Sequence, residues 1–283
     1  MFLGCIIQLI PFYASAQYLS GPVATSVGGA GRASLDPLEG AFLNPATLSQ
    51  LNNYNMGVFF GDSHDLSSGE QRDLSFAISD STPDKILPAA VAVTKRKITR
   101  SALPPVEQRD YYAAVADGVV TNLSMGIGFH RLESTIDSEK VVQNNLHLGF
   151  LFTPSENMGI ALVAYDFLGA DSDILSDIAL RRTVALGFTH IFLDFFQVRL
   201  DWAMVIQANP DHKSKLMLGL ESRLFEFFLL RMGAQRDELT GQTFVAVGSS
   251  FNGPRLALDY ALQRELAPVD GGVRHLIDLR LKF

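Results

Sequence analysis

The feature that most constrains this chain is an alternation of apolar and polar residues with a period of two. Between Val273 and Phe283, the apolar residues Ile277, Leu279 and Leu281 take odd positions, and charged residues take most even ones. Successive side chains of a β-strand point to opposite faces, so this segment predicts a strand with one apolar and one charged face. Because the alternation recurs along most of the chain, it favours a closed barrel with an apolar outside and a polar lumen.

The pattern predicts about fourteen antiparallel strands after residue 53. Their expected spans are 54–61, 71–79, 87–98, 107–117, 121–133, 142–153, 156–167, 179–192, 195–207, 213–224, 226–236, 241–251, 254–264 and 273–283. The connections after even-numbered strands are mostly tight, and those after odd-numbered strands are mostly longer and polar. Up-and-down barrels show this alternation, with short periplasmic turns and longer external loops. We therefore expect an all-β, transmembrane β-barrel in a bacterial outer membrane, with both termini in the periplasm.

Composition fits this fold. Hydrophobic residues make up 47% of the chain and the mean hydropathy is +0.16, which is more apolar than a typical soluble domain. After residue 16, no stretch approaches the ~18 apolar residues that a membrane-spanning helix needs. Chain length alone would also fit one large soluble all-β domain. The net charge of −7 makes nucleic acid an unexpected partner.

The first residues predict an export signal. The stretch from Phe2 to Tyr13 is almost wholly apolar, and Ala14-Ser15-Ala16 forms an A-x-A cleavage site. No Lys or Arg precedes the apolar run, which leaves the true start of the chain open. Since Cys5 is the single cysteine, cleavage after residue 16 would leave no disulfide and no cysteine metal site. Lipidation of Cys5 is the less favoured alternative.

Residues 17–53 do not alternate and are rich in Gly, Ala, Ser and Pro. A barrel of about fourteen strands is too wide for wall side chains alone to fill. We expect this segment to fold inside the lumen as a plug, or hatch, with residues 54–283 forming the barrel. The alternative is a disordered periplasmic tail. The candidate plug residues are Gly28, Gly29, Gly31, Arg32, Asp36, Asn44, Pro45 and Ala46.

Charged residues on the inward positions of four expected strands form a candidate polar network in the lumen. They are Arg199, Asp201, Glu221, Arg223, Arg255, Asp259, Asp278 and Arg280. Because both signs are mixed, we expect them to pair with one another and with the plug, where Arg32 and Asp36 are candidate partners. A polar permeation path is the alternative.

Phenylalanine is abundant near the expected turns, which suits an aromatic girdle at the membrane interface, although core phenylalanines beside turns would give the same pattern. The crowded residues are Phe188, Phe192, Phe195, Phe196, Phe225, Phe227 and Phe228.

Catalytic, metal and cofactor sites are not expected. The six histidines are scattered without metal-ligand spacing, so we expect them to be solvated in loops or the lumen. No serine lies in a G-x-S-x-G turn, and Gly28-Gly29-Ala30-Gly31 lacks the G-K-[ST] ending of a phosphate loop. The aspartates of one expected external loop lack the spacing of a calcium loop, so a solvated acidic loop is favoured. They are Asp166, Asp171, Asp173 and Asp177.

Two regions of the chain carry a family pattern: Ser26–Ala33, Asp36 and Phe42–Leu48 near the start, and Leu256–Leu262, His275 and Leu279–Phe283 near the end. These residues resemble the FadL-type family of outer-membrane hydrophobic-compound channels, and within it the PorV/PorQ-like branch. The resemblance implies a 14-stranded barrel with an N-terminal hatch. The closing strand, which ends in Phe283, also looks like the signal read by the barrel-assembly machinery.

The resemblance leaves three functions open. FadL-type members pass fatty acids or other hydrophobic molecules, which would make this chain a conduit for a hydrophobic small-molecule ligand. PorV-like members serve secretion, which would make it a scaffold or carrier for secreted proteins, with secretion-system proteins as partners. An open porin is disfavoured by the plug-like segment. The conduit is the favoured function, although the short, acidic external loops weaken a fatty acid as the ligand. In each case outer-membrane lipid would surround the barrel.

Overall fold

The fold is known from a computed structural model of the chain. It describes residues 20–36, 38–83, 86–100, 103–170, 174, 178–193, 195–206, 213–268 and 271–283. The expected signal peptide, residues 1–16, lies outside the described residues, as do Asp171, Asp173 and Asp177 of the acidic loop.

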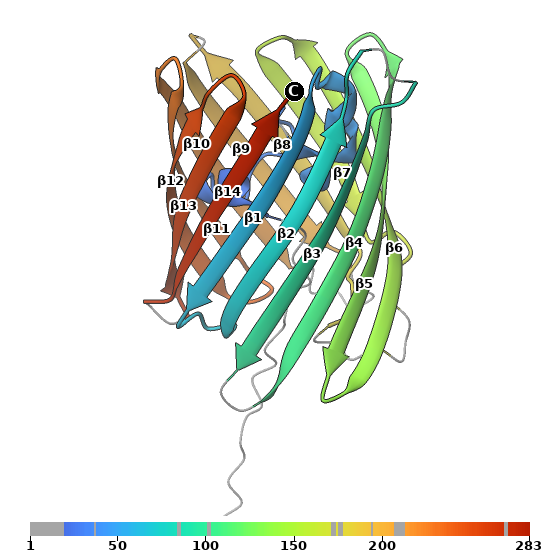
Figure 1. The fold of residues 1–283 in the computed structure, drawn as a ribbon, viewed down its shortest axis with the longest axis vertical. Helices are drawn as coiled ribbons and strands as arrows, with labels where there is room; N and C mark the ends of the chain where they lie inside the picture. The colour runs from blue at the N-terminus through green and yellow to red at the C-terminus, as the bar shows by residue number, and fades with distance from the viewer. Residues whose placement is uncertain are drawn as a thin grey trace, which may run out of the picture.

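Fourteen antiparallel strands close into one barrel, and each strand pairs with its neighbours in the chain (Figure 1). The first strand pairs with the last, so that Asn55 lies opposite Lys282 and His64 opposite Val273. Closure removes the exposed strand edges of an open sheet, which is the reason such sheets can exist in lipid. The predicted all-β barrel of about fourteen strands is therefore confirmed.

The strands occupy almost the expected spans. They are β1 (Tyr54–His64), β2 (Glu70–Asp80), β3 (Ala89–Arg100), β4 (Leu103–Val120), β5 (Leu123–Ile136), β6 (Glu139–Ser155), β7 (Met158–Tyr165), β8 (Thr183–Phe192), β9 (Phe196–Val205), β10 (Ser214–Phe225), β11 (Phe228–Asp237), β12 (Gln242–Asn252), β13 (Leu256–Ala267) and β14 (Val273–Lys282). We call the end with Tyr54 and Phe283 the turn end, and the opposite end the loop end.

The largest departure from the expected spans is at the loop end of β3 to β6, which extend past the other strands (Figure 1). The expected loops 99–106 and 134–141 are largely strand. Beyond the apolar band, charged pairs such as Glu133–Lys140 at 2.9 Å and Lys97–Glu107 at 3.9 Å join neighbouring strands. Cross-strand ion pairs support a sheet without apolar alternation, so the pattern that predicted the strands stopped short of their ends.

The two faces of the wall differ as the alternation predicted. On β5, Met125, Ile127 and Phe129 are exposed on the outside, whereas Ser124 and His130 are buried inside. Near the turns, an exposed set of phenylalanines occupies the outer surface, as an interfacial girdle requires. Its members are Phe192, Phe225 and Phe228.

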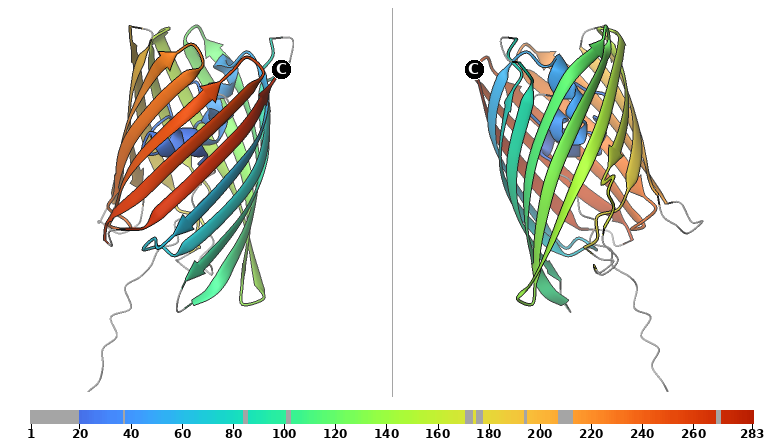
Figure 2. Two further views of the ribbon diagram at one scale, coloured as in Figure 1. Left: turned by 60° about the vertical axis from the view of Figure 1, so that its left-hand side comes forward. Right: turned by 90° about the vertical axis from the view of Figure 1, so that its right-hand side faces the viewer.

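The N-terminal segment, residues 20–53, lies inside the barrel (Figure 2). It forms α1 (Pro22–Ser26), α2 (Gly40–Leu43) and the 3₁₀ helix η1 (Pro45–Gln50). Helix α1 contacts β11 to β14 and η1 contacts β4 to β6, so the segment crosses the lumen. Among the described residues, no helix is long and apolar enough to cross a membrane.

The hydrophobic core lies between this segment and the wall. Leu38 and Phe42 of the segment pack with Phe59, Ala77 and Ala92 of β1 to β3. A second cluster joins Ala41 and Leu48 to alanines of β3 and β4. The small wall side chains leave space that the segment fills, and this burial of apolar surface stabilises the segment in the lumen.

Candidate functional site

The candidate site is the inner wall of the barrel where it meets the N-terminal segment. Asp201 on β9 accepts three hydrogen bonds at one carboxylate oxygen: from the Gly31 amide at 2.9 Å, the Arg32 amide at 3.0 Å and the Arg32 guanidinium at 2.9 Å. Both Asp201 and Arg32 are buried. A single wall carboxylate therefore holds one turn of the segment by backbone and side chain together.

Asp36 is the second charged anchor of the segment. Its carboxylate accepts two hydrogen bonds from the Arg199 guanidinium, one of them at 2.9 Å, in the forked geometry that suits this pair. Arg199 also contacts Glu221 of β10 at 3.0 Å. The Arg199 side chain is 1% exposed, so its guanidinium interacts with these two carboxylates rather than with water.

The ion pairs continue along the wall from Glu221. Arg231 on β11 contacts Glu221 at 2.5 Å and Asp259 of β13 at 3.2 Å. Arg280 on β14 contacts the other oxygen of Asp259 at 2.9 Å. We call Asp201, Arg199, Glu221, Arg231, Asp259 and Arg280 the charged wall.

Three of the expected network residues lie apart from these contacts. Asp278 is buried on β14 but makes no hydrogen bond to any residue that the structure describes. Arg223 lies opposite Leu229 on the inward side of β10 and β11, at the open turn end of the lumen, where its side chain is exposed. Arg255 precedes β13 and is exposed as well.

Sequence reasoning missed Arg231, which joins the two halves of the charged wall. Its strand looked apolar on both faces at its start, and this hid the alternation of Leu230 and Met232 outside with Arg231 inside. A further ion-pair group, Asp73 with Arg96 at 2.9 Å and with Arg274 at 2.7 Å, was also missed.

The expected plug residues lie at the sharpest bends of the segment and at its closest contacts with the wall. Gly28 and Gly29 have φ values of 68° and 81°, which favour glycine. The Asn44 amide donates to the Arg32 carbonyl at 2.9 Å and to the Phe150 carbonyl of β6 at 3.2 Å. The Asn44 side-chain oxygen accepts from the Ala46 amide at 3.1 Å, next to Pro45 at the start of η1.

A belt of glycines on eight strands receives the segment, and sequence reasoning did not find it. An added Cβ at each would lie 2.1 to 2.9 Å from an atom of the segment. The members of this wall-glycine belt are Gly57, Gly126, Gly149, Gly159, Gly187, Gly219, Gly233 and Gly248. Real Cβ atoms do not approach so closely, so the wall carries glycine where the segment must touch its backbone.

Two cavities flank the segment along the barrel axis. The loop-end cavity, of about 170 Å³, is lined by Arg32 and by apolar residues that include Met217 and Phe244. The turn-end cavity, of about 320 Å³, is lined by Asp36 and Ala33 among others. Neighbouring residues of the segment thus face opposite compartments of the lumen, and the segment separates them.

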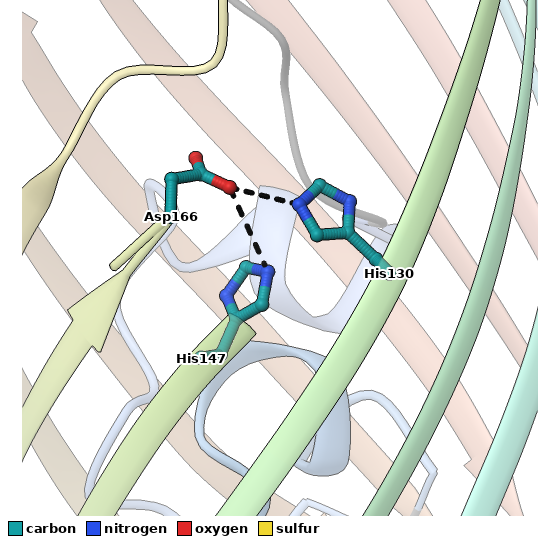
Figure 3. A group of neighbouring side chains, drawn as sticks. All are labelled: His130, His147 and Asp166. Carbon is teal, nitrogen blue, oxygen red and sulfur yellow. Dashed lines mark hydrogen bonds and ion pairs between the residues drawn. The ribbon is translucent and has the colours of Figure 1, made fainter. Parts of the chain in front are cut away.

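A histidine cluster lies on the opposite wall (Figure 3). His130 of β5, His147 of β6 and Asp166 after β7 are 2%, 1% and 1% exposed, so the expectation of solvated histidines is wrong for these two. His130 Nε2 lies 2.8 Å and His147 Nε2 lies 3.9 Å from Asp166 Oδ1. Asn145 is the direct partner of His130 on β6, so strand register places His147 on the same inner face two residues on. The β5–β6 hairpin register could therefore have predicted from the sequence that the two histidines lie close together.

Two tyrosines join this wall to the N-terminal segment. The Tyr112 hydroxyl donates to the Ala41 carbonyl at 3.1 Å, and the Tyr165 hydroxyl donates to the Leu43 carbonyl. The His147 ring lies between them, with centroids 5.9 Å from Tyr112 and 5.2 Å from Tyr165. We call Tyr112, Tyr165, His130 and His147 the aromatic wall.

The closed 14-stranded barrel is similar in fold to solved outer-membrane channels of the FadL type. It is similar to the CymD monoaromatic hydrocarbon channel, with a TM-score of 0.73 and 14% identity over 93% of this chain and 97% of that one. It is also similar to the Ralstonia pickettii toluene transporter TbuX, with a TM-score of 0.69 and 14% identity over 93% and 98% of the two chains. A Pseudomonas aeruginosa FadL homologue gives a TM-score of 0.68 and 11% identity over 96% and 99%.

The likeness is one of fold, because these identities are low. No family model matches the chain, and no curated protein sequence matches it.

Proposed function

We propose that this protein is a bacterial outer-membrane channel that passes a hydrophobic small molecule, with residues 17–53 acting as a hatch. The observation that carries the proposal is a FadL-type barrel whose lumen is divided by its own N-terminal segment into two cavities. Similar barrels include a monoaromatic hydrocarbon channel and a toluene transporter, which supports a hydrophobic cargo. No catalytic role is part of this proposal.

The orientation follows from the connections. Most turn-end connections are two or three residues long, such as 121–122, 156–157 and 226–227, and both ends of the barrel chain lie there. The loop end has two equally short connections, 101–102 and 137–138, but also the longest one, 166–182. Periplasmic turns of outer-membrane barrels are short, so the turn end faces the periplasm and the loop end faces outward. The apolar outer surface would then contact outer-membrane lipid, after insertion by the barrel-assembly machinery acting on the strand that ends at Phe283.

The loop-end cavity has about 170 Å³, enough for a cargo of about one aromatic ring, and it is open to the lumen. Apolar side chains, including Leu43, Ala203, Val205 and Met217, line one part of it, and polar and charged residues line the larger part. A monoaromatic hydrocarbon is the proposed cargo class, supported by the cargo of the similar channels.

Passage requires the segment to move, because it occupies the lumen between the cavities. Its backbone and side chains contact the wall-glycine belt too closely to leave a gap at these glycines. Movement would separate Arg32 from Asp201 and Asp36 from Arg199. The two cavities beside the segment supply the space into which it can move.

A second candidate function, a scaffold or carrier for secreted proteins in the PorV manner, is favoured by the same tight fit. A segment held by buried ion pairs and by eight wall glycines is also what a permanently sealed barrel would contain. Such a barrel would hold a stable secretion-system partner and pass no small molecule.

The test is a reversible lock between segment and wall. Ser34 Oγ and Thr189 Oγ1 of β8 lie 3.4 Å apart and both residues are buried, so Ser34→Cys with Thr189→Cys places two thiols within bonding reach. Cells that produce this variant are assayed for initial uptake of radiolabelled toluene before and after reduction. The single variant Thr189→Cys is the matched control.

A mobile hatch predicts uptake that is lost in the oxidised double variant and restored by reduction, with no redox effect in the control. Uptake equal to that of cells without the protein, in every variant, would overturn the channel. Native mass spectrometry of the barrel purified in mild detergent then separates the two candidates. A bound hydrophobic molecule supports the channel, and a stoichiometric protein partner supports the scaffold.

A further inference from the structure

We propose that His130, His147 and Asp166 bind a divalent first-row transition-metal ion such as Zn²⁺. The three residues come from β5, β6 and the first position after β7, and they meet on the inner face of the barrel (Figure 3). Two imidazoles and one carboxylate are a donor set that suits zinc and its first-row neighbours. This site is separate from the proposed hatch movement and does not depend on it.

The distances between the donor atoms fit one ion. The donor atoms of the three residues all lie within 4.8 Å of one another, with His130 Nε2 at 2.8 Å and His147 Nε2 at 3.9 Å from Asp166 Oδ1. Ligand atoms about 2.0–2.1 Å from a tetrahedral zinc ion are about 3.3 Å apart. The two observed nitrogen–oxygen distances, 2.8 and 3.9 Å, lie on either side of that value, so small side-chain rotations would let all three residues coordinate one ion.

Asp110 supplies the outer support that a metal-binding histidine needs. Its carboxylate lies 3.3 Å from His130 Nδ1, on the far side of the ring from Asp166. Neutral His130 with its proton on Nδ1 would donate to Asp110 and leave Nε2 for the metal. Ligating histidines generally show this arrangement, which sets the tautomer and the ring orientation.

The surroundings give the ion a route and a counter-charge. Asp166 lines the loop-end cavity, which connects the cluster to the lumen. Two carboxylates, Asp110 and Asp166, with two neutral imidazoles would match the charge of a divalent cation.

The competing interpretation is a metal-free ion pair. A protonated His130 could lie between Asp110 and Asp166 and satisfy both carboxylates. In that arrangement His147 packs its ring against Tyr112, Tyr165 and His130, whose ring centroid lies 4.6 Å away. A shared metal ion would in addition take His147 Nε2 as a ligand.

The experiment is a zinc titration of the purified barrel, made without a histidine tag and stripped with EDTA, against a chromophoric chelator. We expect one zinc ion per barrel, and loss of this binding in His147→Ala and Asp166→Asn. Asp110→Asn should weaken binding about 10- to 100-fold, because outer-shell partners contribute this much to affinity. His64→Ala is the matched control, since His64 also has an aspartate at 2.8 Å but is 51% exposed.

Stoichiometry well below one, or equal zinc binding by all variants, would overturn the proposal. Heat-modifiable migration checks that each variant is a folded barrel. If a variant fails to fold, X-ray absorption spectroscopy of the zinc-loaded wild-type protein decides the question instead. Two imidazole ligands support the site, and a zinc ion without imidazole ligands overturns it.

Discussion

The two walls that hold the N-terminal segment do so by different chemistry. The charged wall binds the turn around Arg32 and Asp36 through buried ion pairs. The aromatic wall binds the part from Ala41 to Leu43 through tyrosine hydroxyls that donate to backbone carbonyls. Separating buried ion pairs leaves uncompensated charge, whereas a neutral hydrogen bond is replaced by water at modest cost. The contrast indicates that the Arg32–Asp36 turn is the harder part of the segment to displace.

The largest expected effect comes from breaking the charged wall. Arg199→Ala removes the guanidinium shared by Asp36 and Glu221 and leaves two buried carboxylates without it. We expect the free energy of unfolding to fall by about 3–5 kcal/mol, measured by urea titration in detergent micelles. Single-channel conductance should rise as the segment loosens.

Arg255→Ala is the control for this change, since Arg255 is an exposed arginine that precedes β13 and lines neither cavity. Its effect should stay within about 0.5 kcal/mol. Equal losses in the two variants would mean that the charged wall does not hold the segment.

The next effect tests the wall-glycine belt, which both walls share. In Gly233→Ala the new methyl would lie 2.2 Å from the Gly28 amide nitrogen. Because this is a backbone atom, the clash cannot be relieved by rotating a side chain. Such overpacking should cost about 1–3 kcal/mol in the same urea titration. Gly118→Ala is the matched control because a Cβ there has no heavy atom within 4 Å. A stable Gly233→Ala variant would show that the segment sits more loosely than its contacts indicate.

A smaller effect is expected at the aromatic wall. Tyr165→Phe keeps the ring and removes the hydroxyl that donates to the Leu43 carbonyl, so the loss should be about 1 kcal/mol. Hydrogen exchange should become faster mainly in residues 40–48, with a smaller change at Arg32, whose guanidinium lies 5.5 Å from the Tyr165 ring. Tyr260→Phe, whose hydroxyl contacts His275 at the exposed outer surface, should leave exchange in these residues unchanged. A Tyr165→Phe effect as large as that of Arg199→Ala would erase the contrast between the walls.

The smallest effect is a pH dependence within the segment itself. Burial raises the pKa of Glu39 to about 7, although the carboxylate accepts hydrogen bonds from the Val23 and Ala24 amides at the start of α1. A raised pKa means that the folded segment favours the protonated acid, so this stabilising contribution is complete below about 4.5 and is lost as the pH rises through about 7. Hydrogen exchange in α1 should therefore show lower protection at pH 8 than at pH 5, after correction for intrinsic exchange.

In Glu39→Gln this change in protection between pH 5 and pH 8 should largely disappear, because the amide does not titrate. An unchanged pH dependence in the variant would assign the effect to another group.

Much of the fold could be predicted because strand alternation is a local property. The exposed side chains of Met125 and Ile127 and the buried Ser124 follow from their order in the chain alone. The inward charges Arg199, Asp201 and Asp259 follow in the same way, since opposite charges on one inner face must find partners. That residues 17–53 act as a hatch stays a prediction, although residues 20–53 lie in the lumen.

The sequence by itself determined the strands, their inner and outer faces, and their antiparallel order, because each depends on residues close together in the chain. Only the tertiary structure decided what meets across the lumen: Arg231 between Glu221 and Asp259, the wall glycines against the segment, and His130 with His147 and Asp166. Barrel closure and strand register set these meetings. Closure brings together strands that are far apart in the chain, and the alternation within one strand does not show which residues of distant strands meet.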